Sequence, residues 1–278
     1  MTTDQMAGRG QEALTDNASG DTVLYEDRDG VAFITLNRPH VLNAFDDEML
    51  RAMKQAFVRF AEDDLSRVMV IVGTGDRAFC TGADLKRPLA AGSGSDGVAS
   101  AWNYQAPTPF EILGSIRKPV ITAVNGHCIA GGMLLLLNSD IRIASLDKAT
   151  FQLSEVRIGG FPGGGAAGLL AQQIPYTKAM SLLLTGRRIG ASEAVEMGLV
   201  TSAVRHADLL KTVEETAREI SQLAPLSLSA CKETVRSTMR AREPQIDRYV
   251  ATLLKDTRDR KEGREAFAQG RQPRFDGR

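Results

Sequence analysis

The chain is organised around the sequence NGHCIAGGML, residues 125–134, a glycine turn that opens an apolar helix over residues 133–137. The apolar segment before it, Val120–Val124, has the composition of a strand buried on both faces. Gly131 and Gly132 have no side chain, so another group can approach their backbone closely. A helix N-terminus leaves N–H groups unpaired and favours negative charge. The turn is therefore a candidate site for an anionic oxygen.

A second glycine turn lies upstream, in the sequence AFCTGADLK of residues 78–86. Its Thr81-Gly82-Ala83 turn follows an apolar segment and offers further backbone N–H groups. Downstream, the sequence FQLSE of residues 151–155 ends on a carboxylate, Glu155. Either turn alone is ordinarily just a tight connection between two elements. Two such turns followed by an acid provide the groups that stabilise an oxyanion and move a proton beside it.

Strands and helices alternate around these turns, which predicts an α/β fold with parallel strand pairing. The first two strands are expected to form a hairpin around residues 27–30. Asp46 can cap a helix that runs to about Glu62. Residues 88–100 are rich in Gly and Ser and are expected to form a mobile loop. The expected strands are residues 23–26, 31–36, 68–72, 120–124 and 141–144.

The chain is expected to be helical from Ala166 onward. Residues 206–278 are rich in both charges, and their apolar positions need a surface to pack on. That surface is either the body of the protein or another subunit. Residues 163–168 fit the pattern G-x-G-x-x-G, but they follow no first strand of a dinucleotide-binding unit, so we interpret them as a turn that opens a helix.

The composition argues against several classes of protein. The net charge is zero, which argues against nucleic acid or an anionic membrane as the main partner. Cys80, Cys128 and Cys231 lie far apart and form no CxxC pair, so neither a disulfide framework nor a metal site is expected. No apolar run is long enough to span a bilayer, and residues 1–20 carry no hydrophobic signal region. We expect a cytoplasmic protein with a flexible leader over residues 1–20.

The segments 78–86, 125–140 and 151–165 resemble the crotonase superfamily of acyl-CoA enzymes, and in particular the enoyl-CoA hydratase/isomerase group. The resemblance covers roughly residues 21–278 and includes several further motifs in the same order. These are Asn37-Arg38-Pro39, Leu42-Asn43-Ala44, Lys118-Pro119, Asp140, Leu184-Thr185-Gly186-Arg187, Ala194, Met197-Gly198-Leu199-Val200 and Glu262-Gly263. So many ordered matches make the resemblance specific.

The resemblance implies a fold, an assembly and a set of site residues. The fold is a crotonase-like spiral of ββα units over residues 21–205, followed by a helical region over 206–278 that builds a homotrimer or a hexamer. The N–H groups of Ala83 and Gly131 would form the oxyanion hole, with Glu155 as acid/base. The substrate is an acyl-CoA thioester, so coenzyme A enters as part of it and no metal or redox cofactor is needed. Further substrate and coenzyme A contacts would come from Thr81, Gly82, Asp84, Leu85, Lys86, Gly132 and Leu134.

Leu134 stands where hydratases of this family have the first of two glutamates, and Glu155 matches the second. Leucine cannot hold water or move a proton, whereas a single carboxylate suffices to shift a double bond from C3 to C2. We therefore favour double-bond isomerisation of an enoyl-CoA. Hydration of a 2-enoyl-CoA by Glu155 alone, a reaction on an unusual acyl group and acyl-CoA binding without catalysis are the alternatives.

Three other titratable side chains were considered for the site. Glu111 and Asp96 lie in the region expected to line the acyl pocket, and either could replace the missing acid. The alternative, which we favour, is that both side chains are exposed to solvent and have no role in the reaction. His127 precedes Gly131 in the glycine turn and is expected to be a hydrogen-bonded structural histidine. Glu155 itself is expected to lie partly buried beside apolar residues, which would raise its pKa.

Overall fold

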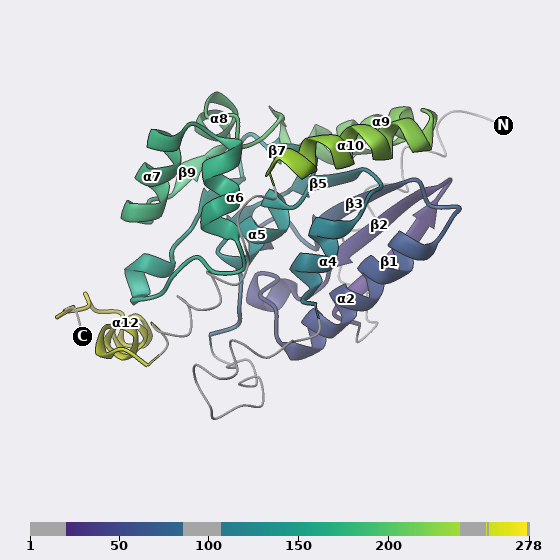
Figure 1. Cartoon of the computed structure of the whole chain (residues 1–278). Coiled ribbons are helices and arrows are strands. Elements are labelled where there is room, and N and C mark those ends of the chain that lie inside the picture. Colours follow the sequence, from purple (N-terminus) through teal and green to yellow (C-terminus); the bar gives the residue numbers. More distant parts are fainter. Residues whose placement is uncertain (1–20, 86–106, 240–253, 255, 277–278) are drawn as a thin grey trace.

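The computed structural model describes residues 21–85, 107–239, 254 and 256–276, and it shows two sheets with helices packed around them (Figure 1). The larger sheet has six strands in the order β1-β2-β3-β5-β7-β10. β1 and β2 pair antiparallel, and every other pair of neighbours in this sheet is parallel. The strands are β1 (Val23–Arg28), β2 (Val31–Leu36), β3 (Val68–Gly73), β5 (Val120–Val124), β7 (Ile141–Ser145) and β10 (Ser202–Val204).

The predicted hairpin is confirmed, and two residues at positive φ make its turn. Asp29 has φ 53° and Gly30 has φ 82°, so the chain reverses within the two residues between β1 and β2. These are the φ values that a tight hairpin turn requires. The predicted strands at 68–72, 120–124 and 141–144 are also confirmed as β3, β5 and β7, each within one residue of the expected ends.

The smaller sheet has four strands in the order β4-β6-β8-β9. Its strands are β4 (Ala78–Cys80), β6 (His127–Ile129), β8 (Thr150–Gln152) and β9 (Ile189–Gly190). β4, β6 and β8 are parallel, and β9 is antiparallel to β8. The prediction of a turn over all of residues 125–132 was wrong, because His127–Ile129 is a strand held by pairing on both sides. The following helix begins at Gly131 rather than at residue 133.

Helices cover both faces of the larger sheet. They are α2 (Asp47–Glu62), α4 (Pro109–Ser115), α5 (Gly131–Leu137), α6 (Ala166–Gln173), α7 (Tyr176–Thr185), α8 (Ala191–Glu196), α9 (Leu209–Ser221), α10 (Pro225–Met239) and α12 (Arg258–Gln269), with short helices η1 (Pro39–Val41), η2 (Glu155–Ile158) and η3 (His206–Asp208). Figure 1 shows α9 on one side of this sheet and α2 on the other. Side chains of β3 alternate between the two layers: Val68 and Val70 pack in the cluster with α9, whereas Met69 and Ile71 pack in the cluster with α2.

The predicted cap of α2 is confirmed, since the Asp46 side chain accepts a hydrogen bond from the Met49 N–H at 3.0 Å. The prediction that the chain is helical from Ala166 onward was partly wrong, because the strands β9 and β10 interrupt the helices. After residue 205 the described residues form the expected helices α9, α10 and α12, and α9 packs on the body of the same chain. Residues 1–20, the loop 88–100, Lys86 and Asp96 lie outside the described residues. Within the described part, none of the helices has the length and apolar character to cross a membrane.

Candidate active site

Three parallel strands of the smaller sheet end at the same edge and bring the predicted site segments together. β4, β6 and β8 are neighbours in that order, and the chain leaves each of them at its carboxyl end. Ala83 follows β4 within three residues, Gly131 follows β6 within two, and Glu155 follows β8 within three. In open α/β sheets, ligands bind at the carboxyl ends of the strands. The topology therefore gathers the two glycine turns and the acid at one edge.

The two turns are in direct contact. A Cβ added to Gly82, which has φ +85°, would lie 2.8 Å from the Cβ of Ala130 and 3.0 Å from the nitrogen of Gly131. A Cβ on Gly132 would lie 2.2 Å from the carbonyl oxygen of Cys80. Only glycine fits at these positions, because a side chain would push the start of α5 away from the end of β4.

In the described part of the chain, the backbone N–H groups of Ala83 and Gly131 do not donate to a neighbouring strand, and the reason differs between the two residues. Phe45 pairs with the turn by accepting from the Asp84 N–H at 3.0 Å and donating to the Gly82 carbonyl at 2.9 Å, so the N–H of Ala83 faces the opposite side. Gly131 is the first residue of α5, where N–H groups have no partner within the helix. Ala130, at φ 52°, makes the bend that starts this helix.

Ala83 and Gly131 both line a large cavity, and its wall near them is apolar. Phe45 and Phe110 stand there with ring centroids 5.6 Å apart at 59°. Leu134 also lines this wall, and its Cδ2 lies 2.6 Å from where a Cβ of Gly164 would be. The volume, about 2500 Å³, exceeds the roughly 300–1,000 Å³ of an ordinary ligand pocket. The cavity accordingly continues past these residues as far as α10.

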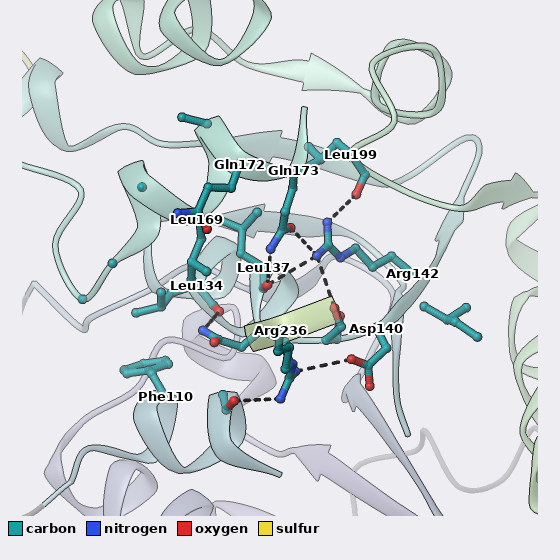
Figure 2. A pocket seen from close by; sticks show the side chains of 18 of the residues that line it. Phe110, Leu134, Leu137, Asp140, Arg142, Leu169, Gln172, Gln173, Leu199 and Arg236 are labelled. Atoms are coloured by element: carbon teal, nitrogen blue, oxygen red, sulfur yellow. Dashed lines mark hydrogen bonds and ion pairs between the residues drawn. The ribbon is translucent and has the colours of Figure 1, made fainter. Parts of the chain in front are cut away.

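The far end of the cavity is polar. Figure 2 shows Phe110, Leu134 and Leu169 at one side, Arg142 and Asp140 at the other, and Arg236 between them. Arg142 is buried and donates to the carbonyl oxygens of Leu199 at 2.9 Å and Ser139 at 3.2 Å. Burial lowers its pKa to about 10. The sequence analysis missed this residue, although an arginine within the apolar strand Ile141–Ser145 was a usable signal.

Glu155 is the first residue of η2, and its side chain is mostly withdrawn from water. Its Oε2 atom is buried and has no hydrogen-bond partner. Burial raises the pKa of the carboxyl group, while a backbone hydrogen bond and the charge of Arg260 lower it by less. The predicted direction of the pKa shift is confirmed. Glu155 is not among the residues that line the cavity, although it follows the same sheet edge as Ala83 and Gly131, so its role in the site stays a prediction.

The other predicted contact residues have varied surroundings. Thr81 donates its hydroxyl hydrogen to the Leu42 carbonyl at 3.2 Å, and Leu85 is 40% exposed. The Asp84 carboxylate is buried and forms an ion pair with Arg38 at 3.3 Å, which fixes the turn to the body. The roles of these residues toward coenzyme A stay predictions.

Of the remaining candidates, Glu111 lies at the cavity, whereas His127 and residues 163–168 have structural roles. Glu111 lines the cavity, but one carboxylate oxygen accepts the Thr108 N–H at 2.8 Å as part of a capping box. His127 is structural, because its Nδ1 lies 2.8 Å from the Thr150 hydroxyl. Gly165 precedes α6 at φ +89°, so the 163–168 motif opens a helix as interpreted. Across the described residues, no three His, Cys, Asp or Glu side chains gather in a way that could hold a metal ion.

Known proteins share this sequence and fold. The family model described as enoyl-CoA hydratase/isomerase matches residues 26–278. An enoyl-CoA hydratase of Mycobacterium tuberculosis is 38% identical over 266 residues, which cover 94% of this chain and 98% of the relative. An (E)-benzylidenesuccinyl-CoA hydratase of Thauera aromatica is 34% identical, with 92% and 99% covered. The crystal structure of a carnitinyl-CoA hydratase from Mycobacterium avium superposes with a TM-score of 0.80 at 33% identity, covering 94% of this chain and all of that one.

The match covers nearly the whole chain at the level of sequence and of fold. It includes the two glycine turns, the acid that follows them and the C-terminal helix α12. The protein is therefore an acyl-CoA enzyme of the enoyl-CoA hydratase/isomerase family, within the crotonase superfamily.

Proposed function

We propose that the protein isomerises the double bond of a 3-enoyl-CoA to the 2-position. In this proposal, the N–H groups of Ala83 and Gly131 donate hydrogen bonds to the thioester oxygen. Glu155 removes a proton from C2, and the negative charge spreads onto the oxygen as a dienolate. The same carboxyl group then returns the proton to C4. Fixed donors of this kind stabilise the charge as it develops, because they need no reorganisation during the reaction.

The observation that carries the proposal is the contrast between Leu134 and Glu155. Leu134 is 5% exposed and offers only methyl groups to the cavity, so it cannot bind the water that hydration needs. Glu155 is a buried carboxyl group with a raised pKa, which suits a group that both accepts and returns a proton near neutral pH. One acid/base group is sufficient for an isomerisation, because the proton that it removes is returned to the substrate and nothing is added.

The proposal extends to the substrate and the assembly. Coenzyme A is bound as part of the substrate, and the chemistry needs no metal or redox cofactor. Thr81, Gly82, Leu85 and Lys86 border the coenzyme A moiety, with Gly132 and Leu134 beside the acyl group. We also infer a homotrimer or a hexamer in the cytoplasm, built by the helical region 206–278.

Turnover of two isomeric substrates by the purified protein tests the proposal. We expect conversion of a 3-enoyl-CoA to the 2-enoyl-CoA, followed by the absorbance of the conjugated thioester. With 2-enoyl-CoA we expect little formation of 3-hydroxyacyl-CoA, assayed by chromatography. A fast release of 3-hydroxyacyl-CoA from 2-enoyl-CoA would overturn the isomerase assignment.

Hydration or dehydration is the second candidate. The relatives named above are called an enoyl-CoA hydratase, an (E)-benzylidenesuccinyl-CoA hydratase and a carnitinyl-CoA hydratase. Glu111 also lines the same cavity as Leu134. In that reaction Glu111 would have to leave its capping box with Thr108 to activate water. Loss of hydration in Glu111→Gln, with isomerisation unchanged, would support this second role.

A further inference from the structure

The C-terminal helix α12 docks directly on η2, the short helix that begins at Glu155. Two glycines make the approach close. A Cβ on Gly159 would lie 2.4 Å from the carbonyl oxygen of Asp259, and a Cβ on Gly263 would lie 2.4 Å from the carbonyl carbon of Ile158. Both obstacles are backbone atoms, which cannot rotate away. The two helices therefore meet at a fixed distance, although about a hundred residues separate them in the chain.

This contact places the guanidinium of Arg260 on the turn that carries Glu155. Arg260 Nη1 donates to the carbonyl oxygen of Ile158 at 3.3 Å, and it lies 2.4 Å from where a Cβ of Gly160 would be. The N–H of Gly160 in turn donates to the carbonyl oxygen of Glu155 at 2.7 Å. Arg260 thus contacts the C-terminal part of the turn, at Ile158 and Gly160, and the Gly160 N–H links that part back to Glu155.

We propose that Arg260 is a positioning residue for Glu155: its guanidinium holds the η2 turn in place and sets a positive charge near the buried carboxylate. The C-terminal helix is then part of the proton-transfer site rather than a purely structural appendage. This inference rests on the proposed function of Glu155 as the acid/base.

The charges around Glu155 support the assignment. Burial raises the pKa of Glu155, and the charge of Arg260 opposes it. The interaction is reciprocal, since Glu155 raises the pKa of Arg260 against burial and the charge of Arg264. Other charged groups also come from the elements packed here: Arg157 on η2, Lys178 on α7, and Asp259 and Arg264 on α12. Among these described groups, the charge of Arg260 lowers the pKa of Glu155.

The charges around Glu155 determine the direction in which the pH profile of activity should shift when Arg260 is replaced. Proton removal needs Glu155 ionised, so the acidic limb of the pH profile of kcat/KM reports the pKa of its free-enzyme carboxyl group. Removing the nearby positive charge destabilises the carboxylate. The acidic limb should therefore move to higher pH when Arg260 loses its charge. A role limited to packing would change the size of kcat/KM but not the position of the limb.

The experiment compares Arg260→Gln, Arg260→Met and Arg260→Lys in the full-length enzyme, with 3-enoyl-CoA as substrate. Lys261→Gln is the matched control, because Lys261 is an exposed cation on the same helix. We expect the acidic limb to move to higher pH in Arg260→Gln and Arg260→Met, to return toward wild type in Arg260→Lys, and to stay unchanged in Lys261→Gln. Arg260→Met keeps a long unbranched side chain without the charge, so it tests the charge if Arg260→Gln fails to fold.

An acidic limb that stays in place in every folded, uncharged variant of Arg260 would overturn the inference. Failure of the proposed function has a different signature. In that case Glu155→Gln would retain turnover, whereas here Glu155→Gln loses turnover and only the response to Arg260 is at issue.

Discussion

Leu134 and Gly164 form a contact in the apolar wall of the cavity. Gly164 has φ +68°, and its missing Cβ leaves the space in which Cδ2 of Leu134 lies. The leucine is thereby held against the glycine-rich segment before α6, where it lines the cavity. Residue 164 therefore determines where the side chain of residue 134 can lie.

Replacing Gly164 with alanine should destabilise the protein by about 1–3 kcal/mol. The positive φ costs about 1–2 kcal/mol for an L-residue, and the new methyl group displaces Leu134. Gly168 is the matched control, because it lies in the helix Ala166–Gln173 and its Cβ would meet nothing within 4 Å. Gly168→Ala should stabilise the protein by about 0.5–1 kcal/mol. Urea denaturation measures both, and equal effects of the two changes would contradict this account of Gly164.

At the scale of elements, α10 fastens the ends of α4 and α5 together. Arg236 donates to the carbonyl oxygens of Gly114 at 2.7 Å and Asn138 at 3.0 Å, which lie at the C-terminal ends of those helices. It also pairs with Asp140 at 3.3 Å, and Lys232 pairs with the other oxygen of the same carboxylate. Cations at helix C-termini satisfy carbonyl groups that have no partner within the helix.

Arg236→Met should lower the free energy of unfolding by about 2–3 kcal/mol, because hydrogen bonds to a charged, mostly buried group are lost. Lys211→Met on α9 is the control: Lys211 is 77% exposed and lies 4.0 Å from Glu215, so its loss should cost no more than about 0.5 kcal/mol. Chemical denaturation monitored by circular dichroism gives both values. If Arg236→Met unfolds at the same denaturant concentration as wild type, the fastening role is wrong.

Elements with a long apolar signal could be predicted from the sequence, and three-residue strands could not. Val120–Val124 was predicted because five consecutive buried residues mark a strand covered on both faces. His127–Ile129 was missed because a strand so short carries no periodicity and is held by its neighbours in the smaller sheet. The start of α5 was misplaced because Ala130, a residue that seldom adopts positive φ, makes the bend.

In the candidate site, too, only features with a local sequence pattern could be predicted. Glycine turns and an acid can be recognised in the sequence, because few residue types serve those roles. Arg260 was missed because its relation to Glu155 depends on how the last helix docks on the body, and no local pattern specifies that contact. The wall formed by Phe45 and Phe110 was missed for the same reason, since aromatic residues are equally common in closed cores.

At the scale of the whole molecule, the buried acid makes stability depend on pH. Burial raises the folded-state pKa of Glu155 above its ordinary value of 4.5, so the folded protein binds this proton more tightly than the unfolded chain. The contribution of Glu155 to stability therefore falls as pH rises from about 4.5 through the folded-state pKa. The Tm of Glu155→Gln minus that of wild type should increase over this range.

For Glu193→Gln, the difference in Tm from wild type should change with pH in the opposite direction. A hydrogen bond from Arg187 lowers the pKa of Glu193, so its stabilising contribution is present above 4.5 and is lost as pH falls through the lowered value. The Tm of Glu193→Gln minus that of wild type should therefore decrease as pH rises. Equal trends in the two variants would contradict the assigned directions.

In the proposed reaction, one carboxylate beside two backbone donors performs the proton transfer, and we claim no second acid. This is tested by measuring kcat for 3-enoyl-CoA in Glu155→Gln and Glu111→Gln, each shown to be folded by circular dichroism. We expect kcat to fall by about 10²–10⁴-fold in Glu155→Gln, the usual contribution of a general acid/base, and to change little in Glu111→Gln. Turnover by Glu155→Gln at the wild-type rate would contradict the claim.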